Sequence, residues 1–121
     1  MLDYKFTKSA NKAIEMASEI AVKFGHNYVG TEHLLYGLAS ENTGVAFKVL
    51  ERQNITPDDI LDDIEELIGK NDEGVDKTLG FTPRCKKAFE NAYREAKKIS
   101  SDFVGTEHIL VGIVKETDSI A

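Results

Sequence analysis

The stretch VGTEHLLYGL at residues 29–38 returns almost unchanged as VGTEHILVGI at residues 104–113. The second copy starts 75 residues after the first (29 to 104), and the same spacing relates the flanking residues without a gap. It places the Phe-Thr pair at 6–7 on the Phe-Thr pair at 81–82. Self-similarity that keeps one register over such a length indicates a duplicated structural unit.

Caps and apolar periodicity predict that each copy is helical. Thr7 can cap a helix that runs to about Phe24 and is stopped by Gly25, and Thr31 is a candidate N-cap for a second helix. After a break at 41–44, two shorter helices are expected, because apolar residues keep recurring at helical spacing. The apolar positions of the first copy are Ala10, Ala13, Ile14, Ala17, Ile20, Ala21, Phe24, Leu34, Leu35, Leu38, Val45, Ala46, Val49, Leu50, Ile60, Leu61, Ile64, Leu67 and Ile68.

The predicted fold is therefore all-α, with two tandem, pseudo-symmetric helical repeats in residues 1–121. We place repeat one at 6–69, a polar linker at 70–80 and repeat two at 81–121. Repeat two ends where its third helix should begin, so we expect it to be truncated. An exposed apolar face on repeat two and a tendency to self-associate should follow.

Charge and composition exclude several classes of protein. The formal net charge of -6 disfavours nucleic acid, which binds clustered Lys and Arg. The single cysteine, Cys85, falls in an expected helix and is interpreted as a small core or boundary residue rather than a nucleophile. The N-terminus has no apolar signal segment, and no apolar run is long enough to cross a membrane. We expect a cytoplasmic protein with neither a nucleic-acid nor a membrane partner.

The repeated Thr-Glu-His does not predict a metal or catalytic centre. Each copy supplies one His and one adjacent Glu, whereas zinc needs three or four ligands, and adjacent helical residues point in different directions. His33 and His108 are interpreted as half-buried packing residues, and His26 has Ser101 as its counterpart. We expect no catalytic residue, no metal and no cofactor in this chain.

Two roles are open for Glu32 and Glu107. A Glu in the first turn of a helix interacts favourably with the helix dipole, which is enough to explain its presence. Alternatively, if the Thr7 end of the repeat lies beside its Thr31 end, a carboxylate stands next to the hydroxyl and N–H groups of helix starts. Such a pocket would suit a ligand that carries both a positive and a negative group.

The doubled motif resembles the N-terminal domain of Clp-type AAA+ unfoldases. The residues that carry the resemblance are Gly-His-Asn-Tyr-Val-Gly-Thr-Glu-His at 25–33, its shorter return at 104–108 and Phe-Thr-Pro-Arg at 81–84. They are most similar to ClpC of Gram-positive bacteria, and the resemblance covers essentially the whole chain. It implies a substrate- and adaptor-binding domain of a hexameric ATPase, with the ATP sites outside this chain.

The same resemblance implies partners and a ligand. The partners are MecA-like adaptor proteins and substrates tagged by arginine phosphorylation, while the ClpP peptidase and the hexamer are contacted through the ATPase modules. Phosphoarginine is expected once per repeat, with the glutamate facing the guanidinium and the threonine near the phosphate. By position these pairs are Glu32 with Thr7 and Glu107 with Thr82.

The expected role is thus binding, not enzymatic catalysis, and the chain has no GxxxxGK[ST] motif. A second hypothesis stays open, in which a stand-alone Clp repeat protein acts as a regulator or adaptor without ATPase modules. The downstream reading frame distinguishes the two, because a Walker A motif soon after residue 121 would support the unfoldase.

Overall fold

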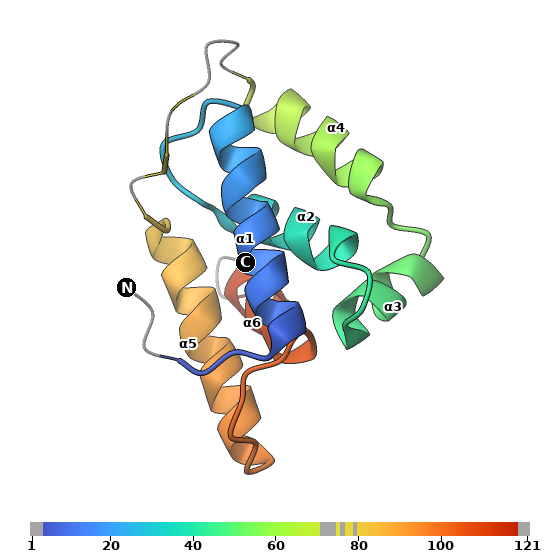
Figure 1. Ribbon diagram of the computed structural model, residues 1–121, viewed down its shortest axis with the longest axis vertical. Coiled ribbons are helices and arrows are strands. Elements are labelled where there is room, and N and C mark those ends of the chain that lie inside the picture. Colours follow the sequence, from blue (N-terminus) through green and yellow to red (C-terminus); the bar gives the residue numbers. More distant parts are fainter. Residues whose placement is uncertain (1–3, 71–74, 76, 79, 119–121) are drawn as a thin grey trace.

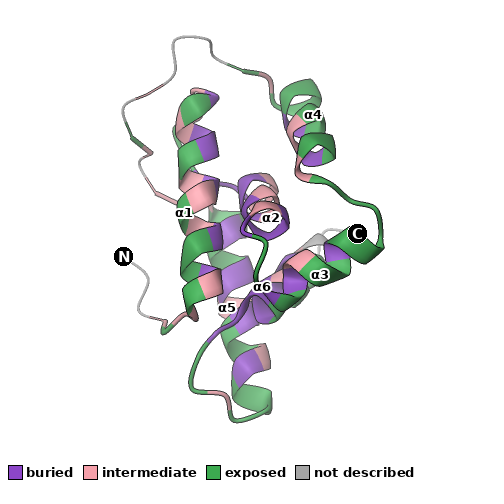
Figure 2. Ribbon diagram, turned by 45° about the vertical axis from the view of Figure 1, so that its right-hand side comes forward, coloured by how far each residue is buried: buried purple, intermediate pink, exposed green. Residues whose placement is uncertain are grey.

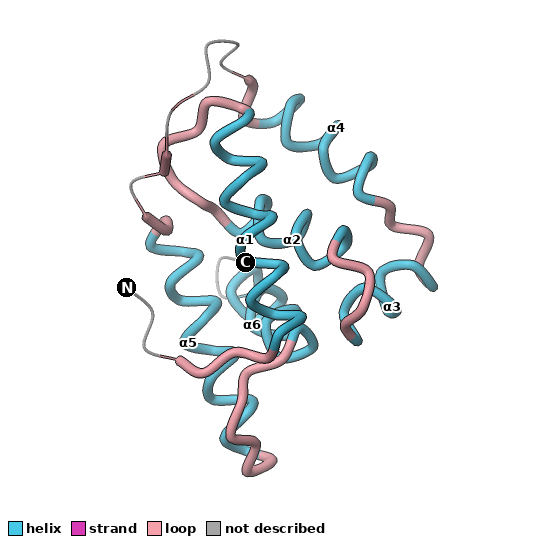
Figure 3. The backbone as a smooth tube through the Cα atoms, viewed as in Figure 1, coloured by secondary structure: helices cyan, strands magenta, loops and turns pink. Residues whose placement is uncertain are grey.

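The computed structural model describes residues 4–70, 75, 77–78 and 80–118, and these residues form six α-helices (Figure 1). The first hairpin joins α1 (Lys8–Lys23) to α2 (Thr31–Ser40), and the shorter helices α3 (Val45–Arg52) and α4 (Pro57–Leu67) follow it. The second hairpin joins α5 (Pro83–Lys98) to α6 (Thr106–Asp118). The described residues contain helices and loops but no strand, so the all-α prediction is confirmed (Figure 3).

Local sequence explains where most helices start and end. The hydroxyls of Thr7, Thr56 and Thr82 accept a backbone N–H from the third residue of α1, α4 and α5. Gly25 follows α1 with a φ of 75°, a left-handed conformation that glycine adopts without strain. The caps predicted at Thr7 and Gly25 are confirmed. The cap predicted at Thr31 is wrong by one residue, because α2 begins at Thr31 and its N-cap is Gly30.

Each hairpin packs through a glycine. A Cβ built on Gly37 of α2 would stand 2.0 Å from the carbonyl oxygen of Ala13 in α1. A Cβ built on Gly112 of α6 would stand 2.2 Å from the carbonyl oxygen of Ala88 in α5. Only glycine permits the helices to approach so closely, and the duplicated motif carries it at the same place in both copies.

Two short parallel bridges join the copies. Phe6 pairs with Val104, and Val29 pairs with Phe81. Exchanging the two copies turns one bridge into the other, as pseudo-twofold symmetry requires. The ring of Phe89 lies between the bridges, edge-on to the rings of Phe6 and Phe81, at 5.6 and 5.2 Å between centroids.

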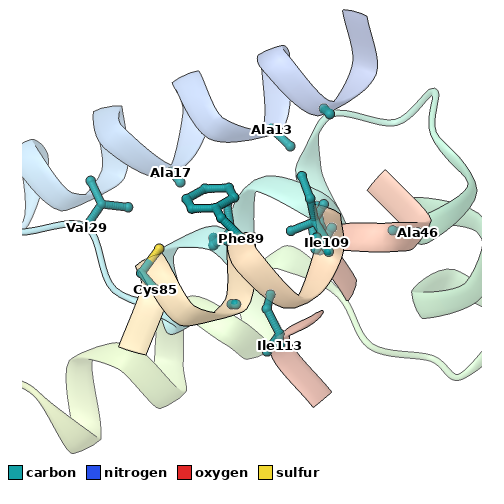
Figure 4. Close-up of a cluster of buried hydrophobic side chains, with 14 of the residues drawn as sticks. Ala13, Ala17, Val29, Ala46, Cys85, Phe89, Ile109 and Ile113 are labelled. Carbon is teal, nitrogen blue, oxygen red and sulfur yellow. The ribbon is translucent and has the colours of Figure 1, made fainter. Parts of the chain in front are cut away.

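One hydrophobic core runs through both copies. Figure 4 shows Phe89 of α5 facing α1 near Ala17, with Cys85 and Ile109 from the second copy close by. All four side chains are buried. Cys85 is a core residue, which confirms its interpretation as a small core or boundary residue, and the buried residues of both copies belong to one cluster.

The outer helices bury less than periodicity predicts. Val45 and Val49 on α3, and Leu67 and Ile68 at the end of α4, are exposed although their spacing assigns them to the core. Figure 2 shows α3 and α4 at the edge of the molecule, each with exposed residues along one side. A surface helix buries one row of side chains, and apolar residues beside that row or past its end stay in water.

The second copy exposes apolar side chains, as expected. Val111 and Val114 on α6 are 39% and 52% exposed, and Phe103 in the preceding loop is exposed as well. A continuous apolar face on repeat two, and self-association through it, stay predictions.

Candidate binding sites

The structure separates the two helix starts of a repeat. In the antiparallel first hairpin, the start of α1 lies beside the end of α2, where the hydroxyl oxygens of Ser9 and Thr43 are 2.8 Å apart. The expected pairing of Thr7 with Glu32 is therefore wrong, and the second hairpin separates its two helix starts in the same way. Antiparallel helices joined by a short loop keep their starts at opposite ends.

Each predicted threonine instead meets the motif of the other copy. The N–H of Thr7 donates to the carbonyl of Val104 at 3.0 Å, and the N–H of Thr82 donates to the carbonyl of Val29 at 2.9 Å. The start of α1 therefore lies at the start of α6, and the start of α5 lies at the start of α2. Each of these two places combines residues from both copies.

We define site I by Thr82 and Glu32, and site II by Thr7 and Glu107. The effect of Glu32 on Cys85 supports the pairing of the α2 start with the α5 start in site I. Burial and, after it, the negative charge of Glu32 raise the pKa of Cys85 to about 12. Cys85 is in the first turn of α5, so the charge of Glu32 acts on the helix start of the other copy.

The two glutamates fold back over their own helix starts. Glu32 and Glu107 are the second residues of α2 and α6, and a Cβ built on Gly30 or Gly105 would stand 2.2 Å from a carboxylate oxygen. The positive end of the helix dipole favours a carboxylate in this place. Glu32 has 37% of its side chain exposed, and Glu107 is exposed. Both carboxylates therefore lie over a helix start and are open to a ligand.

Two histidines fix the same helix starts. The N–H of Gly30 donates to His33 Nδ1 at 2.9 Å, and the N–H of Gly105 donates to His108 Nδ1 at 2.8 Å. Each histidine takes the place of the Glu or Gln in a capping box. Both rings are buried, so half-buried packing was the wrong interpretation. The spacing of three residues from Gly to His is the signal that sequence reasoning missed.

The starts of α1 and α5 supply hydrogen-bond donors. The hydroxyls of Thr7 and Thr82 accept an N–H at 3.1 Å and keep their own O–H for another partner. Helix geometry leaves the first N–H groups without an intrahelical acceptor. In α1 these belong to Lys8 and Ser9, whereas α5 opens with a proline and offers that of Arg84.

Each site thus places a carboxylate beside the donors of a second helix start. A ligand could pair a cationic group with the carboxylate and an anionic group with the N–H and O–H donors. In the part of the chain that the structure describes, no cluster of three or more His, Cys, Asp or Glu could hold a metal ion. No described helix is long and apolar enough to cross a membrane.

The sequence of this chain is similar to those of known proteins. Residues 5–121 match the family described as the Clp repeat (R) N-terminal domain. The chain is 45% identical over its whole length to the ATP-dependent Clp protease ATP-binding subunit ClpC of Staphylococcus aureus, and 44% identical to that of Staphylococcus epidermidis. It spans 15% of the length of either relative, in the N-terminal region.

Solved structures share the fold. The N-terminal domain of ClpD from Arabidopsis thaliana has a TM-score of 0.74 and 24% identity, over 93% of this chain and 77% of that one. The N-domain of ClpV from Vibrio cholerae has a TM-score of 0.76 and 17% identity, over 94% and 69%. A complex of the ClpV N-domain with VipB peptide has a TM-score of 0.74 and 18% identity, over 94% and 70%. At these identities the likeness shows the fold alone.

Proposed function

Because the chain belongs to the Clp repeat N-terminal domain family, we propose that it binds substrates and adaptors for a ClpC-type unfoldase, and that sites I and II each hold phosphoarginine. The observation that carries the proposal is the composite geometry, in which the helix start that carries a glutamate in one copy is joined to a helix start of the other copy. The identity of 45% with ClpC supports the assignment to an unfoldase. The ClpV relative that binds a peptide supports recognition of protein segments.

Phosphoarginine matches the chemistry of these sites. It carries a planar guanidinium, which pairs with a carboxylate through parallel hydrogen bonds, and a phosphoryl group, which helix starts bind through their N–H groups. In site I, Glu32 would face the guanidinium, while Thr82 and the N–H of Arg84 would face the phosphoryl oxygens. In site II, Glu107 and Thr7 would take the same two roles.

The proposed partners divide between this domain and the rest of the unfoldase. Tagged substrates and MecA-like adaptors would dock on the surface described here. Contacts with the ClpP peptidase and within the hexamer would belong to ATPase modules, which would also carry the catalytic residues and ATP. The role proposed for this domain is therefore recognition, in a cytoplasmic unfoldase.

Titration with free phosphoarginine, followed by calorimetry, tests the ligand and the residues together. The wild-type domain should bind two equivalents, and Glu32→Ala or Glu107→Ala should leave one. The double variant should lose measurable binding at both sites, because a charge-assisted pair is lost at each.

The matched control is Glu15→Ala, which removes an exposed glutamate from α1 and should change nothing. Arginine and inorganic phosphate, each alone, should bind more weakly than phosphoarginine. If the double variant keeps its helical circular dichroism and binds as the wild type does, the assignment of the two glutamates is refuted.

A further inference from the structure

His26 links the start of α2 to the end of α4. Its Nδ1 is 2.7 Å from Nε2 of His33, and its Nε2 is 2.8 Å from the carbonyl oxygen of Gly69. Nδ1 of His33 in turn accepts the N–H of Gly30 at 2.9 Å. Three hydrogen bonds therefore run in series from the segment after α4 to the turn that carries Glu32.

The two ends of this series fix the protons within it. The N–H of Gly30 can only donate, so His33 has no proton on Nδ1 and carries one on Nε2. The carbonyl of Gly69 can only accept, so His26 carries its proton on Nε2 and offers Nδ1 as an acceptor. The Nε2–H of His33 then donates to Nδ1 of His26. Both rings are neutral, since an extra proton on either ring removes one of the three bonds.

We propose that His26 and His33 form a positioning relay for Glu32 in site I, and that adding one proton to the pair breaks it. The inference rests on the proposed function, because that proposal makes site I a ligand site. A proton on His33 Nδ1 displaces the N–H of Gly30. It also turns the contact of 3.5 Å between His33 Nδ1 and Glu32 Oε1 into an ion pair. The carboxylate is then drawn away from the ligand.

The surroundings keep the relay neutral at ordinary pH. Burial lowers the pKa of His33 most strongly, Glu32 opposes this shift, and His26 adds to it. Glu32 faces the pair from α2. Phe24, at the end of α1, has its ring 5.9 Å from that of His26, and Lys70 after α4 lies 5.2 Å above the same Phe24 ring. The relay is therefore intact above the ordinary His range and breaks as the pH falls below it.

Among the described residues, site II has no counterpart of this relay. His108 accepts the N–H of Gly105, but Ser101 stands where the first copy has His26. The hydroxyl of Ser101 instead bonds to the backbone of Phe103. The two sites should therefore respond differently to acid, and the second copy serves as an internal control.

Amide NMR tests the relay without any ligand. From about pH 8 to about pH 4, a span that extends below the ordinary His range, the amide signals of Gly30 and Lys70 in the wild type should share one transition. These two amides flank the ends of the relay. His26→Ser, which copies the second repeat, should uncouple Lys70 from Gly30.

His26→Asn is a second variant in case the serine variant unfolds. Its side chain offers an acceptor close to the position of Nδ1 and has no proton to gain in this range, so Lys70 should again stop following Gly30. The relay is overturned if the amide signal of Lys70 does not follow that of Gly30 in the wild type, or if it still follows Gly30 in a folded variant.

Phosphoarginine binding then connects the relay to site I. Glu107→Ala leaves site I alone, and Glu32→Ala leaves site II alone. On acidification, site I should lose about three- to tenfold more affinity than site II, the effect of one net hydrogen bond. His26→Ser should abolish this difference. Equal losses at both sites would overturn the role of the relay in binding, whereas no binding in either variant would contradict the proposed function and leave the amide titration to decide the relay.

Discussion

Phe24 and Ile99 occupy equivalent positions at the ends of α1 and α5, yet Phe24 is 5% exposed and Ile99 is 70% exposed. Ala39 on α2 and Val114 on α6 differ in the same way, at 2% and 52%. α2 contacts both α3 and α4, whereas α6 contacts α3 and not α4. The two hairpins are thus built alike, and the burial of a position depends on which other segment packs over it.

What the copies share is the construction of the hairpin and of the sites. The same glycine brings the two helices of each hairpin together, and the same Gly-Thr-Glu-His stretch opens the second helix of each. They differ in the contacts around the sites, such as the relay at site I. Substitutions at equivalent positions can therefore distinguish features that both copies share from contacts that occur in only one copy.

The largest expected effect is at the hairpin glycines. Gly37→Ala and Gly112→Ala should each lower the free energy of unfolding by about 2–3 kcal/mol, because the new methyl group meets backbone that cannot move aside. Urea unfolding measures both losses, and we expect them to be similar in the two copies. Lys12→Ala, at an exposed position of α1, is the control. A change below about 0.5 kcal/mol at either glycine would contradict the shared construction.

The next effect tests which helix starts belong together. In phosphoarginine binding, Glu32→Ala and Thr82→Ala should couple by about 1–2 kcal/mol, because both act on site I. Glu32→Ala and Thr7→Ala should add without coupling, because they act on different sites. Calorimetry of the single and double variants gives both values, and unfolding curves control for the lost caps. If Glu32 couples with Thr7 instead, each site is built from a single repeat, and the pairing across the two copies is wrong.

This pairing marks the limit of what sequence could predict. The duplication identifies equivalent residues, and local chemistry identifies the caps at Thr7 and Thr82. Neither indicates whether a helix start faces its own copy or the other one. In the twofold arrangement each threonine start pairs with the glutamate start of the other copy. The backbone hydrogen bonds that fix this pairing leave no side-chain pattern in the sequence.

Two other outcomes have equally physical causes. The N-cap of α2 was misplaced because Thr31 has the preferred side chain for a cap, whereas Gly30 caps the helix with help from His33. The burial of Val49 and Leu67 was overestimated because helical spacing shows which side is apolar and not how far a neighbour extends along it. The apolar stripe of α1 was predicted well because both copies cover it.

A smaller effect is expected where the first helix of each hairpin ends. Gly25 and Ser100 have φ angles of 75° and 57°, and this left-handed conformation costs a residue with a side chain about 1 kcal/mol. Ser100→Gly should therefore stabilise the domain by about 0.5–1 kcal/mol, and Gly25→Ala should destabilise it by about 1 kcal/mol. Thermal unfolding measures both. If both substitutions changed the free energy of unfolding in the same direction, side-chain contacts rather than backbone conformation would dominate at these two positions.

The smallest effect concerns a contact that differs between the hairpins. Ile20 is buried in α1, but its counterpart Glu95 bonds to Lys115 at 2.7 Å and lies 2.8 Å from Lys98. The hydrogen bonds from Lys115 and then Lys98 lower the pKa of Glu95 to about 2. A lowered carboxyl pKa contributes stability that is present above the ordinary Glu range and is lost as the pH falls toward about 2.

Glu95→Gln should therefore destabilise the domain slightly at about pH 7, and the difference from the wild type should shrink as the pH falls toward about 2.5. It should shrink with added salt as well, because partly exposed ion pairs are weak and screened. Urea midpoints across pH and salt measure the difference, with Glu15→Gln on α1 as the control. A difference that stays constant would mean that the side chain of Glu95 acts through packing, as Ile20 does in the first copy, and not through its charge.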